Sequence, residues 1–206
     1  MREWTRLASW LALVCLLGCA AKMQVQEGQK TVCRLCQKVI AQDTRTLSVP
    51  KDEARRHKVR VVSDFCTTCT DEVTSAVKRY MASYNDQKTG LIRASFSSQD
   101  KRAAEEMAGK STGDYYREIL NSGPGVGQSE KDYARRALSS PPYRYPLDVS
   151  PKLVPVEEGP FRGGMPSEYD RSHSSVYVIV DDPYQSGPIA FLMIKEQGAW
   201  KISDIG

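Results

Sequence analysis

The residues of this chain best suited to chemistry are four cysteines, arranged in two pairs of identical spacing. Cys33 and Cys36 form the first pair, and Cys66 and Cys69 form the second. Four thiolates satisfy the tetrahedral coordination of zinc, and a gap of two residues lets both sulfurs of a pair reach the ion from one tight turn. The spacing therefore predicts a structural zinc site, which stabilises the fold and leaves no coordination position open for a substrate.

Three other roles of the cysteine pairs have to be weighed against zinc. Disulfides within or between the pairs are chemically reasonable in an oxidising compartment. A redox-active pair of the thioredoxin kind is disfavoured, because neither motif lies between a strand and a helix of a βαβ unit. Haem attachment requires a histidine directly after the second cysteine, where this chain has Gln37 and Thr70. Zinc is the favoured interpretation, and disulfides are the main alternative.

The segments around the cysteine pairs predict the elements that position them. Apolar stretches within 39–49 and 59–62 predict short strands of a ribbon. A helix is expected after the second pair, with Thr70 or Asp71 as its N-cap. Its apolar residues recur at spacings of three and four, namely Val73, Ala76, Val77, Tyr80, Met81 and Tyr84. This order resembles the zinc ribbon and treble-clef families, which implies a small metal-binding module over residues 30–70.

The first eighteen residues have the layout of a secretory signal peptide. A short charged head with Arg2 and Arg6 precedes an apolar run over 7–17, and Gly18 and Cys19 follow it. At about 1.5 Å per residue, this run is too short to cross the roughly 30 Å hydrocarbon core of a bilayer. The start of the chain therefore predicts export, and not a permanent transmembrane helix.

Residues 16–19, with the sequence Leu-Leu-Gly-Cys, resemble the lipobox of bacterial lipoproteins. The resemblance implies cleavage of a signal peptide (1–18) before Cys19, a diacylglyceryl thioether on this cysteine, and an N-acyl chain such as palmitate. Several acyl chains hold a protein stably on a membrane, so we expect a lipid-anchored protein of the bacterial cell envelope with residues 19–29 as its tether. Ala20 at the next position is compatible with sorting to an outer membrane in a cell that has two membranes. An ordinary signal peptide, cut near residues 20–21, is the alternative.

The charge distribution makes nucleic acid an unlikely partner. The formal net charge of +4 falls to +3 once residues 1–18 are removed, because that segment carries two arginines and one glutamate. A basic run at 51–60 lies between the cysteine pairs, but no aromatic residue is interleaved in it for base stacking. We interpret the run as a solvated face, and an anion-binding or nucleic-acid-binding ribbon is kept as an alternative function.

The chain after the second cysteine pair predicts helices first and strands later, which is the order of an α+β domain. Further helices are expected over 91–107, 114–120 and 130–138, and extended segments over 148–156, 175–180, 189–195 and 200–205. Turns rich in glycine and proline separate the later segments and suit antiparallel hairpins. The expected architecture is a four-cysteine ribbon followed by helices packed on an antiparallel sheet.

Residues 198–205, with the sequence Gly-Ala-Trp-Lys-Ile-Ser-Asp-Ile, resemble the closing strand of the cone-shaped superfamily named after nuclear transport factor two. The resemblance implies a curved antiparallel sheet covered by helices over residues 71–206. The superfamily includes enzymes whose cone holds an Asp and His pair, and also many binding or accessory domains. Asp170 and His173 lie here in a polar loop without the apolar surroundings that tune an acid or a base. No catalytic residue is therefore predicted.

These features favour a non-enzymatic binding or accessory protein of the envelope, anchored to the membrane by lipid and stabilised by zinc. Its ligand is an unidentified protein or small molecule. An enzyme that uses a pocket in the cone-like domain is the main alternative, although only the likeness to a superfamily supports it.

Overall fold

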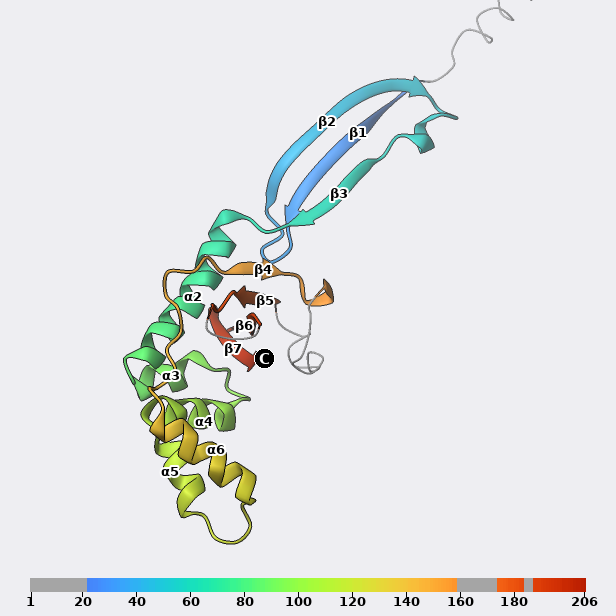
Figure 1. Cartoon of the computed structure of the whole chain (residues 1–206). Helices are drawn as coiled ribbons and strands as arrows, with labels where there is room; N and C mark the ends of the chain where they lie inside the picture. The colour runs from blue at the N-terminus through green and yellow to red at the C-terminus, as the bar shows by residue number, and fades with distance from the viewer. Residues whose placement is uncertain (1–21, 159–173, 184–186) are drawn as a thin grey trace, which may run out of the picture. The chain divides into compact units, whose positions relative to one another are not determined.

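The computed structural model describes residues 22–158, 174–183 and 187–206 (Figure 1). The predicted signal peptide and the lipidation site Cys19 lie outside these ranges. The chain divides into two compact units, of which the first ends at Cys66 and the second begins at Thr67. Within the described ranges, no helix is both long enough and apolar enough to cross a membrane.

The first unit is a three-stranded sheet in the order β2-β1-β3 (Figure 1). β1 (Lys22–Cys33) pairs antiparallel with β2 (Val39–Pro50) and parallel with β3 (Val59–Asp64), and the 3-10 helix η1 (Ala54–Arg56) precedes β3. Most of the segment expected to be a tether, 19–29, therefore belongs to β1. Apolar and polar residues alternate in this segment, which suits a strand that is paired on both sides.

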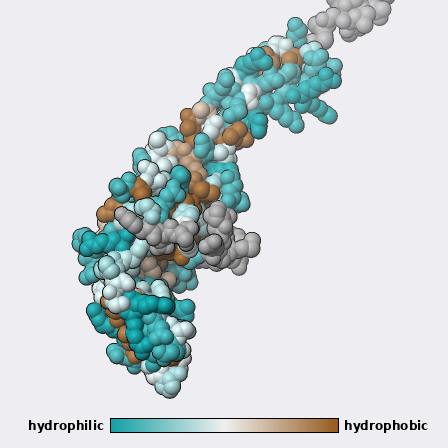
Figure 2. Space-filling model, viewed as in Figure 1, coloured by the Kyte–Doolittle hydropathy of each residue, from teal (hydrophilic) through white to brown (hydrophobic). Residues whose placement is uncertain are grey.

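The sheet of the first unit has almost no apolar core. In the described part of this unit, only Cys33 and Cys66 are buried, and the face that Figure 2 shows is mostly hydrophilic. Met23, Ile40 and Val61, which a core would cover, are exposed. Small sheets need an apolar face packed against another layer in order to be stable in water. Strand pairing alone therefore does not explain the stability of this unit.

The pairing of β1 with β2 requires glycine at position 28. Gly28 has a φ of +139°, and a Cβ added there would lie 2.1 Å from the carbonyl oxygen of Asp43 on β2.

The neighbouring Glu27 carboxylate accepts a hydrogen bond from Arg45 at 3.0 Å and lies 3.3 Å from Nδ1 of His57. The hydrogen bonds from Arg45 and His57 lower the pKa of the Glu27 carboxyl.

The second unit combines helices with an antiparallel sheet, which confirms the predicted α+β fold class (Figure 1). Its helices are α2 (Thr67–Asn85), α3 (Thr89–Ser95), α4 (Lys101–Thr112), α5 (Asp114–Asn121) and α6 (Gln128–Ser139). Its strands pair in the order β4 (Lys152–Val154), β5 (Ser175–Val180), β6 (Ile189–Glu196) and β7 (Ala199–Ile205), and the 3-10 helix η2 (Val156–Glu158) follows β4.

α2 packs on this sheet through the face that the sequence predicts. All six apolar residues that recur along this helix are buried. Tyr80 lies at the centre of the interface, where its ring contacts Phe191 of β6 at 5.8 Å and Phe96 at 5.7 Å in edge-on geometry. The neighbouring strands contribute Val178 and Ile202, both fully buried. The second unit therefore has the apolar core that the first unit lacks.

The prediction of a single helix over 91–107 is wrong. α3 ends at Ser95 and α4 begins at Lys101, because the intervening residues turn toward the edge of the sheet. Phe96 is buried and forms a parallel bridge with Ile202. The backbone N–H of Ser97 donates a hydrogen bond to the carbonyl of Ile202 at 2.9 Å. Burial of an aromatic ring and pairing with β7 here outweigh the local helical pattern.

The strand expected over 148–156 is shorter than predicted and is limited to Lys152–Val154. Pro151 and Pro155 flank this short strand. Since proline has no backbone N–H to donate to a neighbouring strand, pairing cannot extend through either position.

Candidate metal centre

The first cysteine pair lies where β1 turns back into β2. Cys33 is the last residue of β1, and Cys36 lies in the following turn. The turn is closed by hydrogen bonds from the Cys33 N–H to the Lys38 carbonyl at 2.7 Å and from the Gln37 N–H to the Cys33 carbonyl at 2.9 Å. Gln37 adopts a φ of +60° to complete the reversal. The pair therefore occupies a tight knuckle, as its spacing predicts.

The second cysteine pair lies at the start of α2. Cys66 directly precedes the helix, and Cys69 lies in its first turn. The parallel register of β1 and β3 brings Asp64 opposite Cys33. Two residues later, the backbone N–H of Cys66 donates a hydrogen bond to the Cys33 sulfur at 3.4 Å. Strand register and the beginning of a helix thus bring together two pairs that are distant in the sequence.

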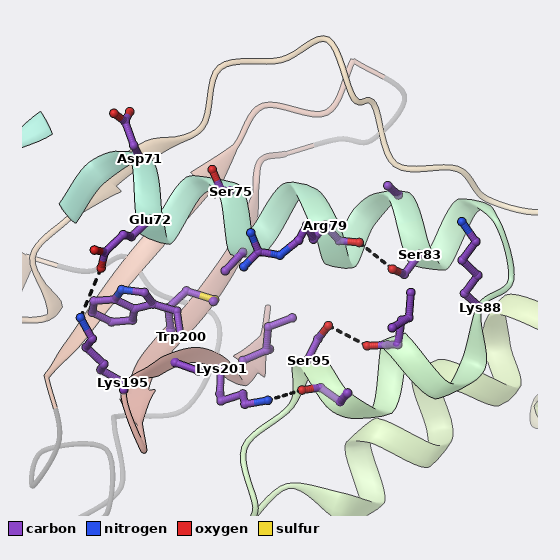
Figure 3. Close-up of a pocket in the computed structure, with 18 of the residues that line it drawn as sticks. Asp71, Glu72, Ser75, Arg79, Ser83, Lys88, Ser95, Lys195, Trp200 and Lys201 are labelled. Carbon is purple, nitrogen blue, oxygen red and sulfur yellow. Dashed lines mark hydrogen bonds and ion pairs between the residues drawn. The ribbon is translucent and has the colours of Figure 1, made fainter. Parts of the chain in front are cut away.

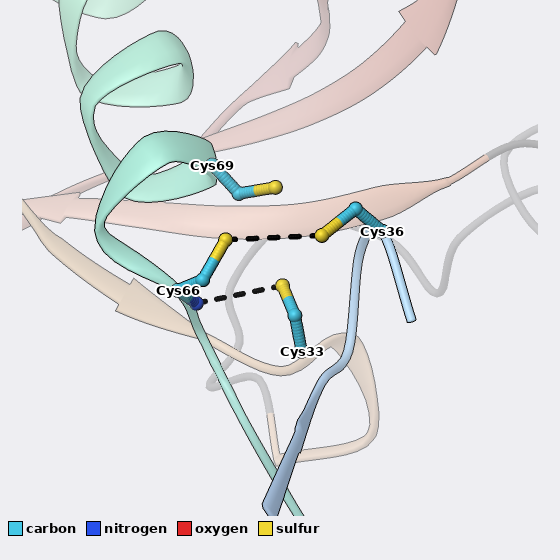
Figure 4. A group of neighbouring side chains, drawn as sticks. All are labelled: Cys33, Cys36, Cys66 and Cys69. Carbon is cyan, nitrogen blue, oxygen red and sulfur yellow. Dashed lines mark hydrogen bonds between the residues drawn. The ribbon is translucent and has the colours of Figure 1, made fainter. Parts of the chain in front are cut away.

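The four cysteine side chains point toward one another (Figure 4). Their sulfur atoms all lie within 4.8 Å of one another, and Sγ of Cys36 is 3.8 Å from Sγ of Cys66. A tetrahedron with metal to sulfur bonds of about 2.3 Å has sulfur atoms about 3.8 Å apart, whereas a disulfide joins sulfurs at about 2.05 Å. No disulfide joins these four cysteines, and the sulfurs are close enough together to hold one ion.

The cluster is enclosed on one side and open on the other. Cys33, Cys66 and Cys69 are buried, while Cys36 is exposed. The buried sulfurs are shielded from oxidants and from competing ligands. The exposed Cys36 leaves a route by which a metal ion can reach the site.

The electrostatic surroundings of Cys33 favour its thiolate form. Burial raises the pKa of this thiol, but hydrogen bonds from the backbone N–H groups of Cys66, Cys36 and Leu35, and from the Cys66 thiol, lower it. Their sum lowers the pKa to about 6. A thiolate is the form that binds metal, so at neutral pH Cys33 is ready to act as a ligand without losing a proton.

The structure therefore brings the four predicted ligands into one group that can hold a metal ion. It is the only group of its kind, with three or more His, Cys, Asp or Glu side chains converging, in the described ranges. The sequence did not predict the backbone N–H groups that surround Cys33. Their orientation depends on the conformation of the turn and cannot be predicted from the residue types. The predicted lipidation site Cys19 and the pair Asp170 and His173 lie outside the described ranges.

Buried tyrosines lie in the core of the described part of the second unit. Tyr80 and Tyr145 meet there with their hydroxyl oxygens 3.4 Å apart, and Asn85 exchanges two hydrogen bonds with the backbone of Tyr145, at 2.8 and 2.9 Å. Burial raises the pKa of Tyr80, and it raises that of Tyr145 to about 12. These hydroxyls stay protonated at neutral pH, and the contacts of the cluster are those of a core.

Comparisons with protein-family models, with curated proteins and with solved structures find no match to this chain. The resemblances to lipoproteins and to the nuclear transport factor two superfamily therefore stay predictions from the sequence.

Proposed function

We propose that this chain is a lipid-anchored protein of the bacterial cell envelope whose four cysteines hold a structural zinc ion. Its second unit binds a protein or small ligand and does not catalyse a reaction. One observation carries the metal part of this proposal: Cys33 and Cys66 are the only buried residues in the described part of the first unit. A unit that buries only metal ligands gains its folding free energy from the metal.

Zinc is the metal that best fits this set of ligands. Soft thiolates also select copper(I) and iron-sulfur clusters, but four sulfurs at the spacing seen between Cys36 and Cys66 suit a single tetrahedral ion. With all four coordination positions taken by the protein, the ion stabilises the fold and does not act on a substrate.

The membrane part of the proposal is supported by residues 16–19, which resemble a lipobox. Attachment through acyl chains requires no transmembrane helix. The binding role is supported by the second unit, whose apolar core needs no metal and which carries an open groove on its surface.

The experiment that tests the proposal measures metal content and intact mass on the full chain, expressed in a bacterium and purified from membranes under reducing conditions without chelator. We expect one zinc ion per chain, and a mass that reports loss of residues 1–18 and gain of acyl chains. Two variants separate the parts of the proposal. Cys66→Ser should lose zinc and keep the lipid, whereas Cys19→Ser should keep zinc and lose the lipid.

Either part can fail without the other. If the protein carries the lipid but no metal, and its four thiols are oxidised in pairs, the cysteines form disulfides and do not bind zinc. Protein that carries zinc but retains residues 1–18 and no lipid would exclude the membrane anchor.

A further inference from the structure

The second unit has a groove of about 860 Å³ between α2, α3 and β7 (Figure 3). Its floor is apolar and includes Met193, Trp200 and Ile202, and its rim carries the cations Arg79 and Lys201. The combination of an apolar floor with a few polar groups at defined positions is typical of sites for small molecules.

Among the described residues, Arg79 is the cation of this groove whose side chain has no ion pair or hydrogen bond. Lys195 pairs with Glu72 at 3.2 Å, Lys88 pairs with Asp86 at 2.8 Å, and Lys201 donates a hydrogen bond to a backbone carbonyl of α3. The Arg79 guanidinium makes no hydrogen bond or ion pair with any part of the chain that the structure describes. Figure 3 shows it on the side of α2 that faces Trp200.

Trp200 contributes an aromatic ring to the lining of the same groove. Its side chain is nine-tenths buried, and its indole nitrogen is the one buried side-chain nitrogen or oxygen in the described ranges without a hydrogen-bond partner. Lys195 lies over the ring, with Nζ 5.6 Å from its centroid. Less than 1 Å² of the indole nitrogen is accessible to solvent, so a ligand in the groove would contact the ring of Trp200 and not its N–H.

We propose that this groove binds an organic anion that has an apolar body and a carboxylate or phosphate monoester at one end. The anionic group is held by the Arg79 fork, which suits both groups geometrically, and the apolar body lies against Trp200 and Met193. Of the three acids that line the groove, Glu72 is engaged by Lys195 and Asp86 by Lys88, which leaves Asp71 as the acid without an ion pair among the described residues. The inference rests on the proposed binding role of the second unit, but on neither zinc nor lipid.

The test uses the full chain with Trp4→Phe and Trp10→Phe, so that Trp200 is the only one of the three tryptophans left whether or not residues 1–18 are removed. Octanoate and octyl phosphate are titrated while Trp200 emission and heat of binding are recorded, and octanol serves as the uncharged probe of the same length. We expect saturable binding of at least one of the two anions, with a change in Trp200 emission, and binding of octanol that is at least about tenfold weaker. A preference between octanoate and octyl phosphate distinguishes a carboxylate ligand from a phosphate ligand.

Two charge variants on the same helix provide a matched control. Arg79→Gln should weaken anion binding by roughly tenfold or more, since a charged hydrogen bond is lost. Lys78→Gln removes the same charge one residue away, where the side chain does not line the groove, and should change the affinity less than about twofold. Thermal melting of both variants checks that the fold is kept.

Three results would overturn the inference. They are no saturable binding of either anion, octanol binding as tight as anion binding, and equal losses in Arg79→Gln and Lys78→Gln. Zinc and lipid are measured in the same samples. A failure of binding in protein that retains both therefore contradicts the groove assignment and leaves the metal and membrane parts of the proposed function standing.

Discussion

The two units of this chain bury very different kinds of residue. In the described part of the first unit, only two cysteines are buried, and long strands expose both their polar and their apolar side chains. The second unit buries a continuous set of aliphatic and aromatic residues between α2 and the sheet β4-β5-β6-β7. Apolar burial accounts for the stability of the second unit, whereas we propose that the first unit gains its stability from a metal ion held by its cysteines.

The difference shows how one chain can use two sources of folding free energy. Apolar burial contributes about 25 cal/mol per Å², and the polar sheet β2-β1-β3 has little apolar area to bury. A structural zinc ion contributes apparent binding free energies of about 10–16 kcal/mol in small modules, a contribution that apolar burial in this sheet does not supply. Because the second unit contributes only Cys69 to the cluster, loss of the metal should affect the first unit far more than the second.

The largest effect is expected from removal of the metal. Chelation under reducing conditions should abolish the protection of backbone amides in β1, β2 and β3, because no core remains to hold these strands. Amides of β5 and β6, which lie in the apolar sheet, should keep their protection. Hydrogen exchange measured by mass spectrometry, with zinc added back as the control, tests this comparison. Retention of full protection in the metal-free first unit would show that our comparison of the two units is wrong.

The converse perturbation removes core volume from the second unit. Phe191 is fully buried and packs on Tyr80, so Phe191→Ala should lower the free energy of unfolding of this unit by about 3–5 kcal/mol. Leu147→Ala is the matched control, because Leu147 is 47 % exposed and its truncation should cost roughly 0.5 kcal/mol or less. Urea unfolding followed by circular dichroism measures both. Zinc content should stay at the wild-type level in both variants, and loss of zinc in Phe191→Ala would contradict independent stabilisation of the units.

The same contrast explains how far the sequence predicts the structure. The cysteine spacing predicts the cluster. A gap of two residues lets both sulfurs of a pair bind the same ion in any fold that brings the two pairs together. The apolar face of α2 is likewise visible as a period in the sequence. Both features depend on residues that are close in the chain.

Features that depend on distant residues are not visible in this way. The break between α3 and α4 results from the pairing of Phe96 with Ile202, about a hundred residues later. The residues around the break therefore contain no pattern that predicts it. The sheet nature of 22–29 depends on partners in β2 and β3. The groove with Arg79 and Trp200 is formed by separate elements whose residues look like an ordinary helix surface and an ordinary strand.

A moderate effect, confined to the first unit, is expected from Gly28→Ala. An alanine there must adopt a φ near +139°, which costs roughly 1–3 kcal/mol in backbone strain, and its Cβ, 2.1 Å from the Asp43 carbonyl oxygen, adds the cost of shifting β2. Because folding of this unit is coupled to the metal, the cost should reduce zinc affinity by about tenfold or more. Competition with a chelating dye measures it. Gly90→Ala, at a position with no atom within 4 Å of the added carbon, should leave the affinity unchanged.

The smallest effect is expected from an exposed ion pair of the second unit. Asp114 begins α5, where Thr112 and Arg117 donate hydrogen bonds to its carboxylate and lower its pKa below the usual 3.8. A depressed pKa contributes stability that is fully present above 3.8 and is lost as pH falls through the lower value of the folded state. Asp114→Asn should therefore lower Tm by about one or two degrees at neutral pH, and the difference from wild type should vanish toward about pH 2. Glu118→Gln, on the same helix, is the control and should not change Tm. A difference between Asp114→Asn and wild type that persists in acid would assign the effect to packing and not to charge.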